Sequence, residues 1–285
     1  LITLDSDSED QLYTLLEQAA ELVLDAGAMD VLVADSPAKM RDAWAARSAF
    51  LEVIMEETKL LVDVMIPVYK PKKQLKHLLA MLAVQTYPVH QVILINTEKK
   101  YWNEEEMREA IPDKLDVVVR HITKQEFDHG ATRHQAMEMA KGDISVCMTD
   151  DAVPADKTLI EHLVQAFRQT GPKGEMVIEA YARQLPNAEC SFVERYTRAF
   201  NYPDRSVVKT KDDLDKYGIK TFFCSNVCAA YKKDIYEKQG GFVRRTIFNE
   251  DMIYAGGLIQ KGYRIAYAAE ARGIHSHNYN CMQQF

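Results

Sequence analysis

Between residues 61 and 170, short apolar runs alternate with longer segments in which apolar residues recur every three or four positions. The apolar runs, which predict strands, cover residues 62–69, 91–96, 116–122 and 143–148. The periodic segments predict helices, most clearly at Leu75, Leu78, Leu79 and Leu82. Together these segments indicate an α/β fold with a mostly parallel, Rossmann-like sheet that helices cover on both faces.

After about residue 175 the pattern becomes mixed. We expect strands over 176–185, 221–231 and 263–268, and helices over 189–200 and 250–261. The first sixty residues predict a small βαβα extension, with strands at 1–4 and 29–34 and helices from Ser8 to about Asp25 and from Ser36-Pro37 to about Lys59. A unit of that size buries little surface on its own.

Composition excludes several classes of protein. The chain has 285 residues, of which 47% are hydrophobic and 27% charged, so it is neither disordered nor a disulfide scaffold. No run approaches eighteen consecutive apolar residues, so we expect no transmembrane segment. The five cysteines are scattered without a CxxC pair, which is typical of reduced thiols in a cytoplasmic protein. Because the chain begins at Leu1 rather than Met, we expect its true start to be missing.

Charge separates the first sixty residues from the rest. Of 42 acidic and 35 basic residues, they carry 13 and 4, which leaves 29 and 31 for the remainder. An acidic chain with a pI of about 5.7 lacks the basic face that nucleic-acid binding requires, so we expect no nucleic-acid partner. The acidic segment could serve as a second catalytic unit, a dimer interface of a homo-oligomer or a linker.

The first candidate site lies where the predicted strands end, because ligands of open α/β sheets bind beyond the carboxyl ends of strands. Asp150 and Asp151 directly follow the strand over 143–148. Adjacent carboxylates repel each other, so they must be solvated, cap a turn or hold a cation. Hard oxygen ligands suit Mg²⁺ or Mn²⁺ bound together with phosphates.

Two further clusters carry titratable groups. Glu250 and Asp251 begin a predicted helix, where carboxylates either complement the helix dipole or act as a general base. His275 and His277 project to one side if the chain is extended, which favours either a metal site or ordinary structural histidines.

Two stretches have equally open interpretations. Gly130 and Arg133 stand at a predicted helix start, which indicates either a phosphate site or a plain capped helix. Ser225 and Asn226 interrupt an apolar strand and must find partners, either backbone groups or sugar hydroxyls on an acceptor.

The ordered motifs resemble those of the inverting family 2 glycosyltransferases with a GT-A fold, closest to the bacterial rhamnosyltransferase-like branch. The resemblance covers about residues 61–285 and leaves 1–60 unexplained. The matching stretches are VDVMIPVYK, FDHGATRHQA, GDISVCMTDDAVP, RQLP, FNYP, GIKTFFCSN, GGF, FNED, IHSHNY and QQF. It implies a nucleotide-sugar-binding half over 61–152 and a mixed acceptor-side half over 153–285. Since similar chains continue past QQF, we expect the C-terminus to be truncated as well.

On the donor side, the resemblance places Pro67, Tyr69 and Asn96 around the base of a nucleotide sugar such as a dTDP- or UDP-sugar. Asp151 corresponds to the metal-binding carboxylate of a DxD-like element, with Asp150 in its middle position. The resemblance also places Arg133 near the diphosphate.

For catalysis, the resemblance implies that Asp251 of the Glu250-Asp251 pair is the base and that His275 or His277 completes the shell of a Mn²⁺ or Mg²⁺ ion. The acceptor would be a saccharide in surface polysaccharide biosynthesis, often lipid-linked, which implies work at the inner membrane face. Thr149 replaces the first DxD aspartate, and Asn96 stands where an aspartate is usual, which leaves the base preference open.

The chemistry explains these residue types. Glycosyl transfer expels a nucleoside diphosphate whose growing charge a divalent ion neutralises. The acceptor hydroxyl loses its proton to a carboxylate and attacks the opposite face, which inverts the anomeric centre. The alternatives are a non-catalytic nucleotide-sugar or saccharide-binding module and, less favoured, a metal hydrolase built on His275, His277 and an aspartate.

Overall fold

The computed structural model describes residues 4, 6–28, 31, 33–34, 36–46 and 59–276, and the chain divides into two compact units, residues 1–59 and 60–285. In the described part of the first unit, helix α1 spans Glu9–Asp25, as predicted, and a second helix covers residues 37–46. Residues 31, 33 and 34, within the predicted second strand, are not in a strand. The predicted strand at 1–4 lies almost wholly outside the described residues.

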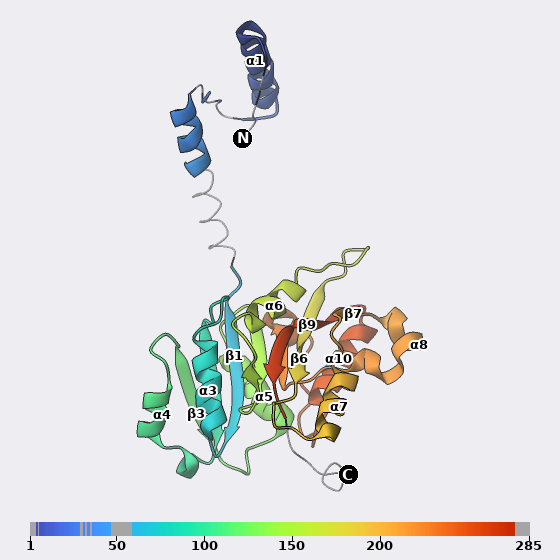
Figure 1. Cartoon of the computed structure of the whole chain (residues 1–285). Coiled ribbons are helices and arrows are strands. Elements are labelled where there is room, and N and C mark those ends of the chain that lie inside the picture. Colours follow the sequence, from blue (N-terminus) through green and yellow to red (C-terminus); the bar gives the residue numbers. More distant parts are fainter. Residues whose placement is uncertain are drawn as a thin grey trace. The chain divides into compact units, whose positions relative to one another are not determined.

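The larger unit is built on one sheet (Figure 1). Its strands follow the order β3-β2-β1-β4-β8-β6-β9-β5, with β7 also paired to β9. The strands are β1 Val62–Tyr69, β2 Gln91–Thr97, β3 Val117–Ile122, β4 Ile144–Met148, β5 Val153–Pro154, β6 Val177–Leu185, β7 Val207–Lys209, β8 Cys228–Lys232 and β9 Arg264–Ile274. The four strands predicted between residues 61 and 150 are confirmed to within one residue at each end.

The sheet has a parallel half and a mixed half. Strands β3, β2, β1 and β4 run parallel, whereas β8 is antiparallel to both β4 and β6, and β6 is parallel to β9. Val68 of β1 lies opposite Asn96 of β2, which lies opposite His121 of β3. The carboxyl ends of the parallel strands therefore meet at one edge of the sheet, where the sequence predicts donor binding.

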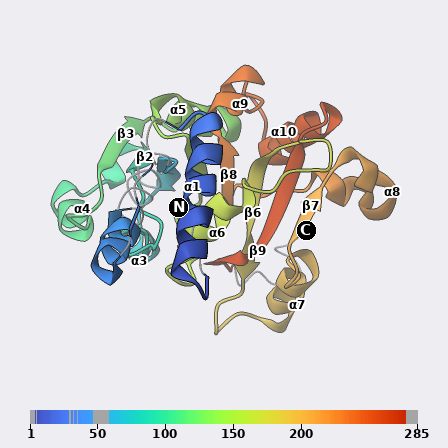
Figure 2. The ribbon, with the colours of Figure 1, turned by 90° about the horizontal axis from the view of Figure 1, so that it is seen from above.

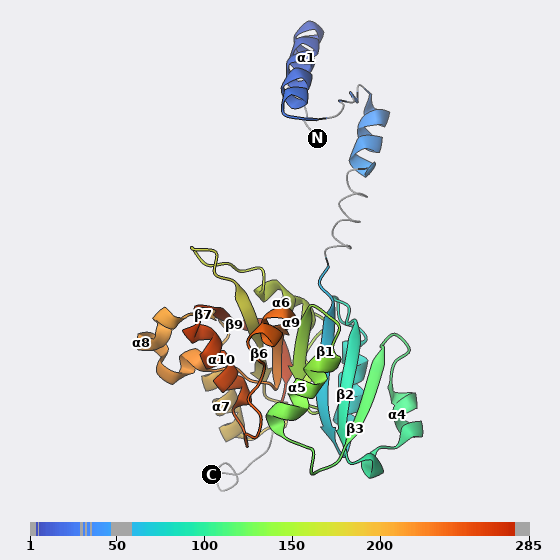
Figure 3. The ribbon, with the colours of Figure 1, turned by 180° about the vertical axis from the view of Figure 1, so that it is seen from behind.

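Helices cover both faces of this sheet (Figures 2 and 3). The α-helices of the unit are α3 Lys73–Leu82, α4 Glu104–Ala110, α5 His129–Met139, α6 Leu159–Ala166, α7 Phe192–Asn201, α8 Leu214–Tyr217, α9 Lys233–Lys238 and α10 Glu250–Gln260. Short 3-10 helices span η1 Lys99–Tyr101, η2 Lys211–Asp213 and η3 Gly218–Phe222. Helices α3 and α6 pack on one face, and α5, α9 and α10 on the other.

Alternate residues of a strand point into the hydrophobic cores on the two faces of the sheet. The strands are therefore continuous apolar runs in the sequence. Val64 and Ile66 of β1 pack in the core beneath α3 and α6, whereas Met65 packs in the core beneath α5 and α10. The leucine stripe of α3, from Leu75 to Leu82, is almost completely buried, and each such side chain stabilises the fold by roughly 1.5–3 kcal/mol.

One predicted strand needs correction. Residues 221–231 form the end of η3, an irregular turn and then β8, so Ser225 and Asn226 lie in the turn rather than inside a strand. The four described cysteines are unpaired and buried. Among the described residues, every helix is too short or too polar to cross a membrane.

Candidate functional site

The first acidic pair follows β4 and contacts the ends of neighbouring strands. The backbone N–H of Thr149 donates to the carbonyl of Val227 at 3.2 Å, which ties this turn to the one that precedes β8. Burial, followed by the charge of Asp151, raises the pKa of Asp150 to about 6, and a hydrogen bond from the backbone of Tyr69 opposes the rise. Asp150 therefore reaches the end of β1, while the side chain of Asp151 remains 37% exposed.

His275 directly follows β9 and faces the first acidic pair. Its Nε2 lies 3.4 Å from Oδ1 of Asp151, and its Nδ1 lies 3.1 Å from Oε1 of Gln184. The structure thus brings together two of the three predicted metal ligands, and the third, His277, lies outside the described residues. A carboxylate beside an imidazole suits Mn²⁺.

This donor set fits a divalent ion only in part. Over residues 59–276 and the described part of 1–46, no three His, Cys, Asp or Glu side chains surround a common point. An ion beside Asp151 and His275 would take its remaining ligands from water and phosphate oxygens, as Mg²⁺ and Mn²⁺ sites with few protein ligands do.

The second acidic pair opens α10. Asn249, in the left-handed region at φ 66°, ends the preceding loop so that α10 begins at Glu250. The carboxylate of Asp251 accepts hydrogen bonds from the backbone N–H groups of Asn226 at 2.9 Å and Met252 at 2.8 Å. Burial raises the pKa of Asp251, and the charge of Glu250 adds to the rise. Asp251 is thus a better proton acceptor than an ordinary exposed aspartate.

Glu250 is buried, and its carboxylate contacts two side chains, whereas the carboxylate of Asp251 accepts from backbone N–H groups. Its Oε1 lies 3.2 Å from Nη1 of Arg133 and accepts from Nδ2 of Asn226 at 3.0 Å. The hydroxyl of Tyr231 donates to Oδ1 of Asn226 at 2.8 Å, and Nη1 of Arg133 also donates to the carbonyl of His129. This network fixes Asn226 and occupies Nη1 of Arg133 inside the fold. A role of Arg133 at the diphosphate stays a prediction.

One side chain that sequence analysis did not single out joins the two acidic pairs. Gln184, near the end of β6, contacts His275 through Oε1 and donates from Nε2 to Oγ of Ser225 at 3.0 Å. Asn226, the next residue, donates its N–H to Asp251. The only signal in the sequence was a polar residue near the end of an apolar strand, within the RQLP stretch.

Aromatic and cationic groups gather at the end of β1. Pro67 lies opposite Ile95 of β2, and Tyr69, two residues later, is 44% exposed. The rings of Tyr69 and Tyr101 meet edge to face at 5.6 Å, and Nζ of Lys70 lies 5.2 and 4.8 Å from their centroids. A base could stack on such rings, and the ammonium could face phosphate.

Asn96 lies fully buried beside this group. Its Nδ2 is 3.0 Å from Nδ1 of His121, but its Oδ1 has no hydrogen-bond partner among the described residues. A buried acceptor without a partner is costly unless a ligand or water satisfies it.

The start of α5 favours the capped-helix interpretation of the Gly130 motif. The carboxylate of Asp128 accepts from the N–H of Ala131 at 2.7 Å. A Cβ at Gly130 would lie 1.9 Å from the carbonyl oxygen of Val243, so close backbone packing requires glycine there.

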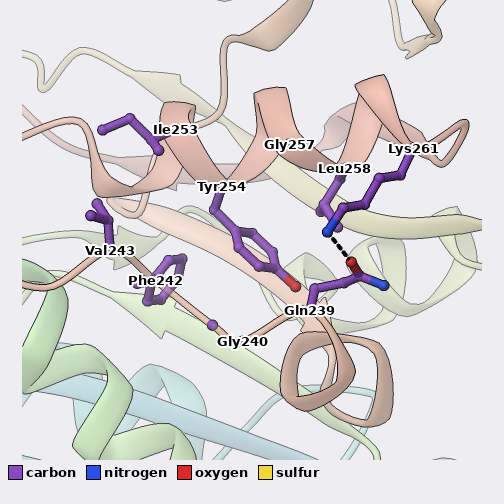
Figure 4. Close-up of a pocket in the computed structure, with 10 residues that line it drawn as sticks. Gln239, Gly240, Phe242, Val243, Ile253, Tyr254, Gly257, Leu258 and Lys261 are labelled. Carbon is purple, nitrogen blue, oxygen red and sulfur yellow. Dashed lines mark hydrogen bonds between the residues drawn. The ribbon is translucent and has the colours of Figure 1, made fainter.

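A separate cavity of about 260 Å³ lies beside α10 (Figure 4). The rings of Phe242 and Tyr254 line it, and Lys261 donates to Gln239 at its side. It contains none of the predicted site residues.

Comparison with known proteins finds a matching family profile and relatives of this chain. A profile described as Glycosyl transferase family 2 matches residues 63–240. The chain is 34% identical over 225 residues to the O-antigen chain rhamnosyltransferase RfbN of Salmonella typhimurium, a match that covers 79% of this chain and 69% of RfbN. It is 40% identical over 165 residues to the O-antigen chain rhamnosyltransferase WbaN of Salmonella anatum, covering 58% of this chain and 51% of WbaN. This chain thus spans about half of WbaN.

One further relative matches a short stretch, and one solved structure matches at low sequence identity. A stretch of 72 residues is 56% identical to a D-lactate dehydrogenase of Anaerostipes hadrus, which covers 25% of this chain and 15% of that protein. Among solved structures, the mannosyltransferase PcManGT from Pyrobaculum calidifontis, in complex with GDP-Man and Mn²⁺, superimposes with a TM-score of 0.56 at 16% identity, covering 76% of this chain and 57% of PcManGT. That similarity shows a shared GT-A fold.

Proposed function

This chain belongs to glycosyl transferase family 2, and we propose that it transfers rhamnose from a nucleoside-diphosphate donor to a hydroxyl group of a saccharide acceptor. The names of RfbN and WbaN, O-antigen chain rhamnosyltransferases, support rhamnose as the sugar and surface polysaccharide as the product. One observation carries the proposal. The contacts His275–Gln184, Gln184–Ser225 and Asn226–Asp251 connect the Asp151 end of the site to Asp251.

Asp251 acts as the base in this proposal. Hydrogen bonds from Asn226 and Met252 hold its carboxylate in place, while burial raises its pKa. It takes the proton of the acceptor hydroxyl as the oxygen attacks the anomeric carbon opposite the leaving diphosphate, which inverts that centre. Glu250 does not compete for this role, because Arg133 and Asn226 occupy its Oε1 inside the fold.

Asp151 and His275 would hold Mn²⁺ or Mg²⁺ at the other end of the site. When bound, such an ion neutralises the charge that grows on the departing diphosphate. Asp150 anchors this turn to the end of β1 through the backbone of Tyr69. Tyr69, Tyr101 and Lys70 would receive the nucleoside, and Asn96, whose Oδ1 has no partner among the described residues, lies on the next strand opposite Val68.

The proposal is tested with the purified chain and an NMR assay of the product. We expect calorimetry with dTDP, UDP and GDP to show binding of one nucleotide that requires Mn²⁺ and is lost with a chelator. With the matching sugar nucleotide and a saccharide acceptor, a new glycosidic bond of inverted configuration should form. A lipid-linked saccharide, presented in vesicles, tests whether the acceptor lies at a membrane surface.

The result that would refute the proposal is a folded protein that releases no nucleoside diphosphate from dTDP-rhamnose or from UDP- and GDP-sugars with any acceptor. Binding without release would instead favour a nucleotide-sugar-binding module. Calorimetry distinguishes a protein that binds nucleotide without releasing it from one that does not bind, because it detects nucleotide binding without an acceptor.

A further inference from the structure

We propose that Gln184 is a positioning residue that keeps a hydrogen on Nδ1 of His275 and so presents Nε2 of the ring to a cation beside Asp151. The inference rests on the proposed function, because it concerns the ion that donor binding would require. It goes beyond that function by assigning a role to a side chain that does not itself face the reacting groups.

Arg198 identifies which end of the Gln184 amide is the oxygen. Nη1 of Arg198 contacts the atom assigned as Oε1 of Gln184. A guanidinium group only donates hydrogen bonds, so the atom that it contacts must be the carbonyl oxygen. The amide nitrogen then faces Tyr202 and Ser225, whose hydroxyl oxygens can accept its two hydrogens.

The oriented amide in turn determines the form of the imidazole. Oε1 of Gln184 lies 3.1 Å from Nδ1 of His275 and can only accept. Nδ1 must therefore carry a hydrogen, whether the ring is neutral or protonated. In the neutral ring, Nε2, 3.4 Å from Oδ1 of Asp151, is then the nitrogen whose lone pair can bind a metal.

Two residues of α7 hold this arrangement in place. Oε1 of Glu194 accepts from Nε of Arg198 at 2.8 Å and lies 2.8 Å from Nη2. Glu194 and Gln184 are each 3% exposed and His275 is 6% exposed. Water has little access to replace any partner, so the direction of each hydrogen bond follows from the one before it.

With the opposite ring form, hydrogen on Nε2 would point at Asp151, and the pair would make a hydrogen bond instead of offering two ligand atoms. By keeping a hydrogen on Nδ1, Gln184 leaves Nε2 as the nitrogen that can lose its hydrogen and offer a lone pair beside Asp151. The same amide donates to Ser225, so it also steadies the turn whose next residue bonds to Asp251.

Nitrogen-15 NMR of the histidine ring tests the assignment without donor, acceptor or turnover. In the parent protein, with His275 assigned through a His275→Gln variant, we expect hydrogen on Nδ1 both before and after Mg²⁺ is added. Hydrogen on Nε2 with a bare Nδ1 would overturn the assignment.

Metal binding provides the second readout, followed as free Mn²⁺ by electron paramagnetic resonance in the presence of UDP, dTDP or GDP. We expect Gln184→Leu to weaken Mn²⁺ binding about 10–100-fold, the usual effect of losing such an outer partner. Gln184→Glu, which still accepts from both Arg198 and His275, should restore most of it. The matched control is Gln165→Leu, because Gln165 contacts His162 at 3.3 Å on an exposed helix face and should have no effect.

Parental Mn²⁺ affinity in a folded Gln184→Leu protein would refute the role of Gln184. If that variant does not fold, the NMR of the parent and the Mn²⁺ affinity of Gln184→Glu decide. A parent protein that binds no Mn²⁺ with any of the three nucleotides refutes the metal role in the proposed function, whereas a wrong ring form refutes only the part assigned to Gln184.

Discussion

The backbone N–H of Asn226 donates a hydrogen bond to Oδ2 of Asp251 at 2.9 Å, and the side chain of the same asparagine donates to Glu250. One residue thus distinguishes two neighbouring carboxylates. Glu250 is held inside the fold by Arg133 and Asn226, which leaves Asp251 as the proposed base.

The pKa of Asp251 predicts a pH dependence. A base acts in its ionised form, so kcat/KM should rise with pH through the pKa of Asp251 and then level off. Burial and the charge of Glu250 raise that pKa, which places the acidic limb above the pH of about 4 expected for an ordinary aspartate. An NMR titration of the Asp251 carboxyl carbon measures this pKa, and a midpoint at or below pH 4 would contradict the predicted rise.

Asp251→Asn should remove turnover while donor binding remains. The amide is nearly the same size but cannot take a proton and can accept only one of the two backbone hydrogen bonds, so we expect kcat to fall about 10²–10⁴-fold. Calorimetry with nucleotide and Mn²⁺ should give the parental Kd. Asp234→Asn is the control, because Asp234 is an exposed partner of Lys238 on α9 and should leave kcat unchanged. Comparable turnover in the two variants would exclude Asp251 as the base.

Arg133→Met should destabilise the fold strongly. Arg133 and Glu250 form a buried pair at 3.2 Å, and removal of the cation leaves a buried carboxylate, at a cost of about 3–5 kcal/mol. Urea unfolding measures the change. Lys238→Met, which removes an exposed pair four residues apart in sequence, should cost no more than about 0.5 kcal/mol. Equal losses of unfolding free energy in the two variants would show that the buried pair contributes no more to stability than the exposed pair.

Two helical glycines should respond oppositely to alanine. A Cβ at Gly130 would lie 1.9 Å from the carbonyl oxygen of Val243, so Gly130→Ala should lower the free energy of unfolding by about 1–3 kcal/mol. Gly257 of α10 has no heavy atom within 4 Å of such a Cβ, and it stands at the cavity of Figure 4. Gly257→Ala should therefore raise stability, by up to about 1 kcal/mol. Thermal unfolding of both variants checks the pair, and a stable Gly130→Ala protein would contradict the packing.

The structure brings some of the predicted site residues together and pairs others with unexpected partners. The contact between His275 and Asp151 unites two groups that stand 124 positions apart in the sequence. The ligand role of either residue stays a prediction, as does the role of His277 outside the described residues. Arg133 meets Glu250, a pairing that no local pattern could indicate.

Local patterns in the sequence predicted the parallel half of the sheet, its covering helices and the family, because periodicity and ordered motifs are local properties of the chain. They misassigned residues 221–227 as strand, since an apolar run can be buried equally well in a 3-10 helix and a turn. The pairing of polar groups followed only from the packing of the folded chain. The partners of Gln184 come from α7, the turn before β8 and the end of β9, and hydrogen bonds between such distant segments follow from packing in space, not from spacing along the chain.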